Sequence, residues 1–154
     1  MTVRRSAGLL LFRRAADGPQ VLLGHMGGPF FARKDAGAWT VPKGEYEPAE
    51  PAWDAARREF REELGLEPPD GEAIALGEVR QTNGKLVTAW AVEADLDPAA
   101  VVPGTFTMEW PPRSGRLREF PELDRVAWFG LEQARAVIVT AQAAFLDRLA
   151  EHSA

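Results

Sequence analysis

The sequence predicts an α/β fold of the α+β type, with a mixed β-sheet and helices interspersed along the chain. Short apolar runs of strand length fill the first half of the sequence, and turn-forming residues separate them. One sharply delimited helical segment follows, and a longer helical stretch closes the chain. With 154 residues, 45% apolar and 27% charged, we expect a single globular domain over 1–154.

The first strands form a predicted hairpin. The runs SAGLLLFRR (6–14) and GPQVLLGHM (18–26) have strand length, and an Asp-Gly pair lies between them as a turn signal. After a glycine-rich loop, AWTVP (38–42) is a brief extended segment, because Pro42 disfavours helical angles at the residue before it.

A second hairpin is predicted after the central helix, because Asn-Gly is the strongest short hairpin signal and lies between two apolar runs. The remaining segments comprise one strand, a loop, a last short strand and one or two closing helices. In chain order, the hairpin strands and these segments are 73–81, 85–94, 105–110, 111–124, 125–129 and 131–152.

The central helix is predicted over 51–64. Pro51 suits a first helical position, and Glu50 lies beside the positive end of the helix dipole. Gly65 can adopt the left-handed conformation that commonly ends a helix. This segment is therefore the best-defined element of the chain.

The central helix has an acidic face. At about 100° per residue, the carboxylates of Glu59, Glu62 and Glu63 converge on one side. The buried side is expected to carry Trp53, Phe60 and Leu64. Small side chains on the acidic stripe predict room for a ligand beside the carboxylates; they are Ala52, Ala55 and Ala56.

A solvated charged face is the simplest interpretation of these glutamates, but their spacing argues against it. Glu59 and Glu63 repel each other at the four-residue spacing, and Glu63 lies near the negative end of the helix. A divalent cation would reverse the sign of this interaction, since hard ions prefer oxygen ligands. Arg58 precedes Glu62 by four residues and can orient its carboxylate. The pattern therefore predicts a metal site.

Composition excludes several other classes of function. The net charge of −5 argues against nucleic-acid binding, which depends on basic residues. No apolar run reaches the 18 or more residues of a membrane span, and no secretory signal is evident, so we expect a cytoplasmic protein that does not bind membranes. The chain has no cysteine and only two histidines, so a metal should be held by oxygen.

Gly44, Glu50 and the run Arg58-Glu59-Phe60-Arg61-Glu62-Glu63-Leu64-Gly65-Leu66 form one motif over the segment 44–66. In residues and spacing this motif resembles the complete Nudix box of the MutT-like Nudix hydrolases. The resemblance implies the Nudix fold, in which a mixed β-sheet core is sandwiched between helices. It also implies hydrolysis of a nucleoside diphosphate linked to another group, X.

The same resemblance implies roles for individual residues. Glu59, Glu62 and Glu63 would bind Mg²⁺, or alternatively Mn²⁺, together with the backbone carbonyl near Gly44. Glu50 and Arg58 would brace the loop and the helix. The general base would be Glu59 or a later glutamate, and of Glu119 and Glu122 we select Glu119. The predicted catalytic set is Glu59, Glu62, Arg58 and Glu119.

Substrate contacts are predicted outside the helix. Lys43 is expected to contact a phosphate and Trp39 to stack on a base. Arg116, with Arg113 and Arg118 in the same loop, is a candidate for outer phosphates, against the simpler interpretation of a solvated loop.

A nucleoside triphosphate or a dinucleoside polyphosphate is the expected substrate. The alternative is a non-catalytic Nudix module that senses or binds nucleotides. Whether the chain acts as a monomer or a homodimer stays open.

Overall fold

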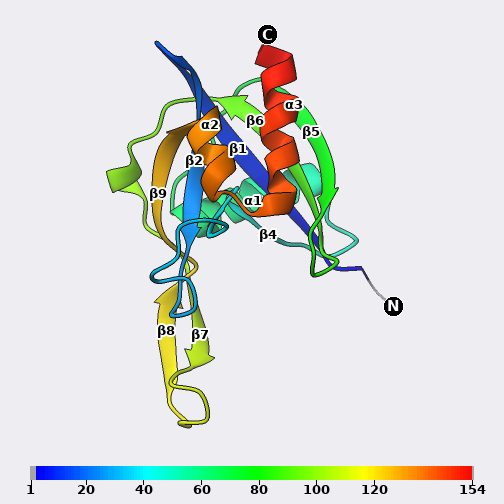
Figure 1. The fold of residues 1–154 in the computed structure, drawn as a ribbon. Helices are drawn as coiled ribbons and strands as arrows, with labels where there is room; N and C mark the ends of the chain where they lie inside the picture. The colour runs from blue at the N-terminus through cyan, green and yellow to red at the C-terminus, as the bar shows by residue number, and fades with distance from the viewer. Residues whose placement is uncertain (1–2, 154) are drawn as a thin grey trace.

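A computed structural model describes residues 3–153, and its elements follow the predicted order (Figure 1). The strands are β1 (Arg5–Ala15), β2 (Gly18–Met26), β3 (Trp39–Thr40), β4 (Lys43–Glu45), β5 (Ala73–Arg80), β6 (Leu86–Glu93), β7 (Thr105–Glu109), β8 (Leu117–Pro121) and β9 (Leu123–Gly130). The helices are α1 (Ala52–Leu64), α2 (Leu131–Val137) and α3 (Ala143–Ser153), with short 3₁₀ turns at Pro98–Ala100 and Thr140–Gln142.

Seven strands form one mixed sheet. Its main path is β3-β2-β1-β6-β5, while β4 pairs with β1 and β9 pairs with β2. Strands β1 and β6 run parallel, and every other pair in this sheet is antiparallel. The predicted fold class, a mixed α+β sheet with helices, is therefore confirmed.

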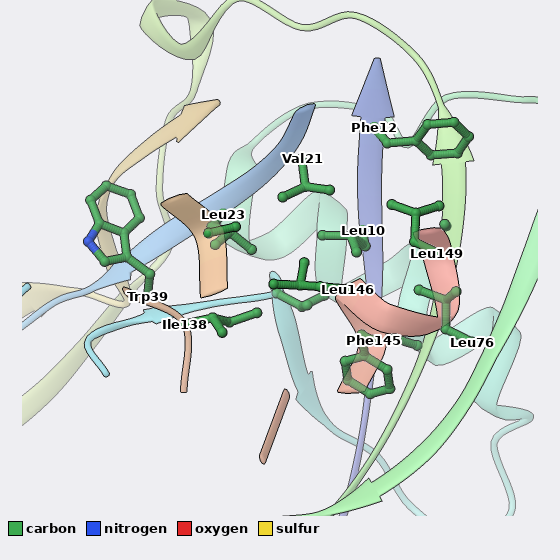
Figure 2. Close-up of a cluster of buried hydrophobic side chains, with 14 of the residues drawn as sticks. Leu10, Phe12, Val21, Leu23, Trp39, Leu76, Ile138, Phe145, Leu146 and Leu149 are labelled. Atoms are coloured by element: carbon green, nitrogen blue, oxygen red, sulfur yellow. The ribbon is translucent and has the colours of Figure 1, made fainter. Parts of the chain in front are cut away.

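Helices cover both faces of the sheet because successive β1 side chains point to opposite sides. Leu9 and Leu11 are buried in the cluster that contains Phe60 and Leu64 of α1. Leu10 lies in the other cluster with Phe145 and other residues of α3 (Figure 2). The sheet is thus the middle layer, and α1 is fixed against it by its apolar side.

The alanines of α1 also belong to this packing. Ala55 and Ala56 have no exposed surface and lie in the same cluster as Leu9. The expectation that they leave room for a ligand is wrong. Their small size instead allows close packing of the helix on the sheet.

Both predicted hairpins are confirmed, but one predicted loop contains a strand. The segment 111–124 was expected to be a loop, whereas β8 lies inside it and pairs with β7. Apolar and polar residues do not alternate regularly in the sequence LREFP, and β8 pairs only with β7. Apolar periodicity therefore gives little signal for a strand there. This two-stranded hairpin projects away from the main sheet (Figure 1).

Within residues 3–153, no helix has both the length and the apolar character that a membrane crossing requires.

Candidate active site

Helix α1 positions the glutamates through its buried anchors and its capped end. Phe60 and Leu64 are fully buried beneath the sheet, so the adjacent positions 59, 62 and 63 are held in fixed directions. Gly65 ends the helix in the left-handed conformation, φ 66°, and its N–H donates to the Arg61 carbonyl at 2.8 Å. The observed helix begins at Ala52, with Pro51 as the residue before it.

The helix meets four other segments at one pocket, which we call the carboxylate pocket. It gathers five glutamates, two lysines and small residues from β1, β4, α1, the start of β6 and the base of the β7–β8 hairpin. The lining residues are Ser6, Lys43, Gly44, Glu45, Glu59, Glu62, Glu63, Lys85, Gly104, Thr105 and Glu122. Sequence reasoning did not select Ser6, Lys85 or Glu122 for this site, because only the tertiary fold brings them there.

Only glycine fits at position 44, because there is no space for a side chain. A Cβ atom at this position would lie 1.9 Å from Oε2 of Glu59, far inside van der Waals contact. The Glu59 carboxylate therefore occupies the volume that any other residue at position 44 would fill. Glu59 is only 7% exposed as a result of this close approach and of the helix packing.

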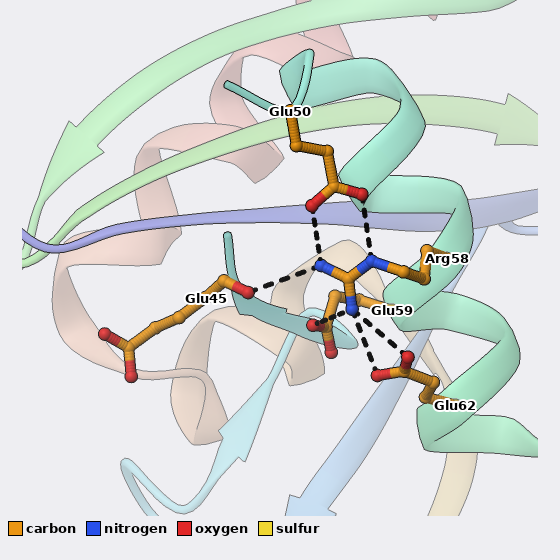
Figure 3. A network of polar contacts seen from close by, with 5 residues as sticks. All are labelled: Glu45, Glu50, Arg58, Glu59 and Glu62. Carbon is orange, nitrogen blue, oxygen red and sulfur yellow. Dashed lines mark hydrogen bonds and ion pairs between the residues drawn. The ribbon is translucent and has the colours of Figure 1, made fainter. Parts of the chain in front are cut away.

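Arg58 connects three of the carboxylates (Figure 3). Its Nε and Nη2 donate to the two carboxylate oxygens of Glu50 at 2.9 Å, a bidentate pair. Its Nη1 donates to Glu59 at 2.7 Å and lies 3.2 Å from both Glu62 oxygens. Nη2 also approaches the carbonyl of Glu45 at 3.5 Å. One guanidinium thus braces the loop before α1 and orients two side chains on its acidic face.

The pocket holds more negative charge than its cations neutralise. Burial, together with the nearby charges of Glu122 and Glu59, raises the pKa of Glu63 to about 8, against the opposing charge of Lys43. Burial also raises the pKa of Glu59, against the opposing effect of Arg58, and the pKa of Glu122. Burial and then Lys85 lower the pKa of Lys43 to about 8.

These shifts give a pH-dependent contribution to stability. Glu63 binds its proton with a pKa of about 8 in the folded chain, against an ordinary value of 4.5. Between these pH values the folded state keeps a proton that the unfolded state has lost, so the metal-free protein loses stability as pH rises. We expect Glu63→Gln to melt at about the wild-type temperature at pH 5. At pH 8.5 it should melt about 6 °C above wild type, which corresponds to a free energy of unfolding higher by an amount on the order of 2 kcal/mol after solvent screening.

Thermal melts of both proteins in EDTA at the two pH values check this expectation. A melting-temperature difference between variant and wild type that is the same at both pH values would contradict it. Excess Mg²⁺ should reverse the order at pH 8.5, because a bound cation stabilises the ionised wild-type carboxylate.

A hard divalent cation fits this set of donors. Carboxylate oxygens are what Mg²⁺ and Mn²⁺ prefer, and the pocket lining holds five glutamates against two lysines. Among residues 3–153, the Oγ of Ser6 is the only fully buried side-chain polar atom without a hydrogen-bond partner, and Ser6 lines this pocket. An occupant that brings hydrogen-bonding groups would satisfy it. In the described part of the chain no three acidic or histidine side chains are already arranged as a ligand set.

A wider hollow borders Arg58 on another side, lined by residues that include Arg4, Tyr46 and Glu50. Two of its three carboxylates are already paired, because Arg4 binds Glu45 at 2.7 Å and Arg58 binds Glu50, which leaves only Glu47. The bond from Arg4 lowers the pKa of Glu45 to about 2. This hollow therefore offers a cation no comparable cluster of uncompensated charge.

Three residues that were predicted to bind substrate or to take part in catalysis lie outside the carboxylate pocket. Trp39 is 4% exposed; its Nε1 donates to Asp35 at 2.7 Å, and its ring packs edge-to-face against His25 and Phe129. Base stacking by Trp39 is therefore contradicted, because the core already covers its ring.

Arg116 and Glu119 belong to the projecting hairpin. Arg116 lies in its turn region and Glu119 on β8 opposite Thr107, and both are exposed and absent from the pocket lining. The structure does not bring Glu119 to the carboxylate pocket. Glu122, three residues later, lies there instead, because β8 ends at Pro121 and the chain turns back along the sheet.

Comparison with known proteins agrees with this geometry. A family model described as NUDIX domain matches residues 2–149. Among solved structures, an Ap4A hydrolase of C. elegans in a binary complex is similar over 96% of both chains, with 22% identity and a TM-score of 0.68. The NUDIX domain of Shewanella oneidensis NrtR, complexed with ADP ribose, covers 99% of this chain and 89% of its own at 14% identity, TM-score 0.65. RenU, a Nudix hydrolase from M. smegmatis, is 26% identical over 96% of this chain and 83% of its own, TM-score 0.57. No curated protein matches.

Proposed function

The chain belongs to the NUDIX domain family of hydrolases that act on pyrophosphate bonds, and on this premise we propose that it is a Mg²⁺-dependent nucleotide pyrophosphohydrolase. Its substrate would be a nucleoside diphosphate linked to a further group. The observation that carries the proposal is the gathering of Glu59, Glu62, Glu63 and Glu122 in one pocket with too little positive charge.

In this proposal Glu59, Glu62 and Glu63 hold Mg²⁺, or Mn²⁺ in its place, with the backbone carbonyl of Gly44. The bound ion supplies neutralisation of the phosphate charge and lowers the pKa of the attacking water. An acidic protein needs this help, because its own carboxylates would otherwise repel a diphosphate.

The remaining residues orient groups or move protons. Arg58 orients Glu59 and Glu62 through the bonds described above and keeps them from turning away from the pocket. Glu122 takes the role first assigned to Glu119 and accepts the proton of the attacking water, since burial raises its pKa toward the working pH. Lys43, on β4 beside these carboxylates, contacts a substrate phosphate.

A nucleoside triphosphate or a dinucleoside polyphosphate is the substrate class we propose. The similarity to an Ap4A hydrolase supports it at the level of fold. A sensing module is the alternative, because the chain is also similar in fold to an NrtR domain complexed with ADP ribose. The intact set of acidic residues at the family's spacing favours the enzyme.

A hydrolysis screen tests the proposal. The purified chain is incubated with Mg²⁺ and nucleoside triphosphates, dinucleoside polyphosphates, ADP-ribose or nucleotide sugars, and products are identified by mass. We expect cleavage of at least one class, abolished by EDTA and restored by excess Mg²⁺. Tight binding of a nucleotide without turnover of any compound would instead favour the sensing module.

A further inference from the structure

The β7–β8 hairpin leaves directly from the wall of the carboxylate pocket. Gly104 and Thr105, where β7 begins, line the pocket, and so does Glu122, just after β8. Two backbone bonds fix this base: Glu122 N–H donates to the Gly104 carbonyl at 2.8 Å, and Gly27 N–H donates to the Glu122 carbonyl at 2.9 Å. The hairpin is thus rigidly connected to the site and extends outward from it (Figure 1).

One face of this hairpin combines aromatic rings with guanidinium groups. Phe106 pairs with Phe120 and Met108 with Arg118, and cross-strand partners lie on the same face. Trp110 N–H donates to the Arg116 carbonyl at 2.9 Å, which continues the pairing one step further. By alternation, the hairpin glutamates at 109 and 119 fall on the opposite face.

The glycine-rich loop 27–38 packs against this same face. The ring of Phe30 meets Trp110 edge-to-face at 5.5 Å, and a Cβ atom at Gly28 would lie 3.0 Å from Phe106 Cζ. The loop is held in turn by the buried ring of His25, whose Nε2 donates to the Lys34 carbonyl at 2.6 Å. We call Phe30, Trp110, Arg116 and Arg118 the distal face.

The distal face is not explained by core packing. Phe30 stays 59% exposed although it touches Trp110, and Arg116 and Arg118 are exposed. The loop leaves Trp110 half-buried and most of the Phe30 ring exposed, so packing of the loop on the hairpin does not account for the exposed ring. Exposed rings suit stacking on a nucleobase, and arginines suit phosphate oxygens. The chemistry is that of a nucleotide site in a chain whose net charge is −5.

The separation between the two regions sets the length of the ligand. Five residue steps lie between Thr105 at the pocket and Trp110, and an extended strand covers about 17 Å over that length. A substrate that occupies both regions must therefore continue well beyond its reacting phosphates.

We propose that the distal face binds the second nucleotide of a dinucleoside polyphosphate whose reacting phosphates lie in the carboxylate pocket. This inference rests on the proposed function, because it assigns the substrate class of the same site. Phe30 and Trp110 contact the distal base, and Arg116 and Arg118 contact the outer phosphates.

The test compares a substrate that spans both regions with one that does not. Values of kcat/KM for diadenosine tetraphosphate and for ATP are measured with Mg²⁺ for wild type, Trp110→Ala and the double variant Arg116→Gln/Arg118→Gln. We expect each change to reduce the ratio of the first value to the second at least about 10-fold, mainly through KM. Trp110→Phe should restore most of the ratio. Arg14→Gln, an exposed arginine on β1 paired with Glu93, is the matched control.

An unchanged ratio in both distal-face variants overturns the inference. Light scattering gives a second such outcome: wild type is a dimer, Trp110→Ala is a monomer, and the ratio is the same in both. Calorimetric binding of both nucleotides in a Glu62→Gln background separates this inference from the proposed function. If no nucleotide is hydrolysed but the variants weaken only diadenosine tetraphosphate binding, the proposed function fails and the distal site stands. If hydrolysis occurs with equal losses for both nucleotides, the distal site fails alone.

Discussion

Replacing Glu62 or Glu63 by glutamine is expected to lower Mg²⁺-dependent kcat/KM at least about 100-fold, which exceeds the usual effect of losing an outer partner of a metal ligand. The amide keeps the size of the side chain but removes the negative charge that attracts a hard cation. The fold should persist, since the Glu62 side chain is 57% exposed and ionisation of Glu63 destabilises the metal-free protein. Initial rates of product formation and circular dichroism check both parts.

The matched control is Glu47→Gln, an exposed glutamate of the same acidic segment that does not line the carboxylate pocket. It should keep the wild-type rate. If Glu62→Gln and Glu63→Gln both hydrolyse every accepted nucleotide at the wild-type rate, the assignment of these residues as metal ligands is wrong.

Replacing Arg58 by alanine should reduce stability and activity together. The change removes hydrogen bonds to Glu50, Glu59 and Glu62 and leaves three carboxylates without this partner. We expect the free energy of unfolding to fall by an amount on the order of 2 kcal/mol, which corresponds to about 6 °C in Tm. This value includes a reduction for solvent screening, because the Arg58 side chain is 35% exposed. We also expect kcat/KM to fall about 10- to 100-fold, as for other groups that orient metal ligands.

Arg58→Lys should recover part of the stability but little of the activity, because a lysine cannot reproduce the bidentate bond to Glu50. Arg61→Ala is the control on the same helix, since Arg61 bonds the exposed Glu67 outside the pocket. Equal losses in Arg58→Ala and Arg61→Ala would show that Arg58 has no special role at the site.

The acidic helix illustrates what local sequence can predict. The period of an α-helix, the proline before it and the glycine after it are local properties, so the bounds of α1 and the shared face of Glu59, Glu62 and Glu63 followed from spacing. The bonds from Arg58 to Glu50 and Glu62 followed from spacing and from the family pattern.

Residues outside the helix show where local sequence was insufficient. Trp39 and the alanines of α1 were assigned to the ligand, yet packing against distant strands buries Trp39, Ala55 and Ala56. Burial is a property of pairs of segments far apart in the chain, and residue type alone does not decide it.

By itself, therefore, the sequence determined the order of the main elements, the family and the acidic face of α1, because these depend on periodicity and on residues close together in the chain. Only the tertiary structure decided that Ser6, Lys85 and Glu122 join that face while Glu119 stays outside. The choice between Glu119 and Glu122 depends on where β8 ends and the chain returns to the sheet. Such a position is set by long-range strand pairing, and the spacing of residues along the chain does not contain it.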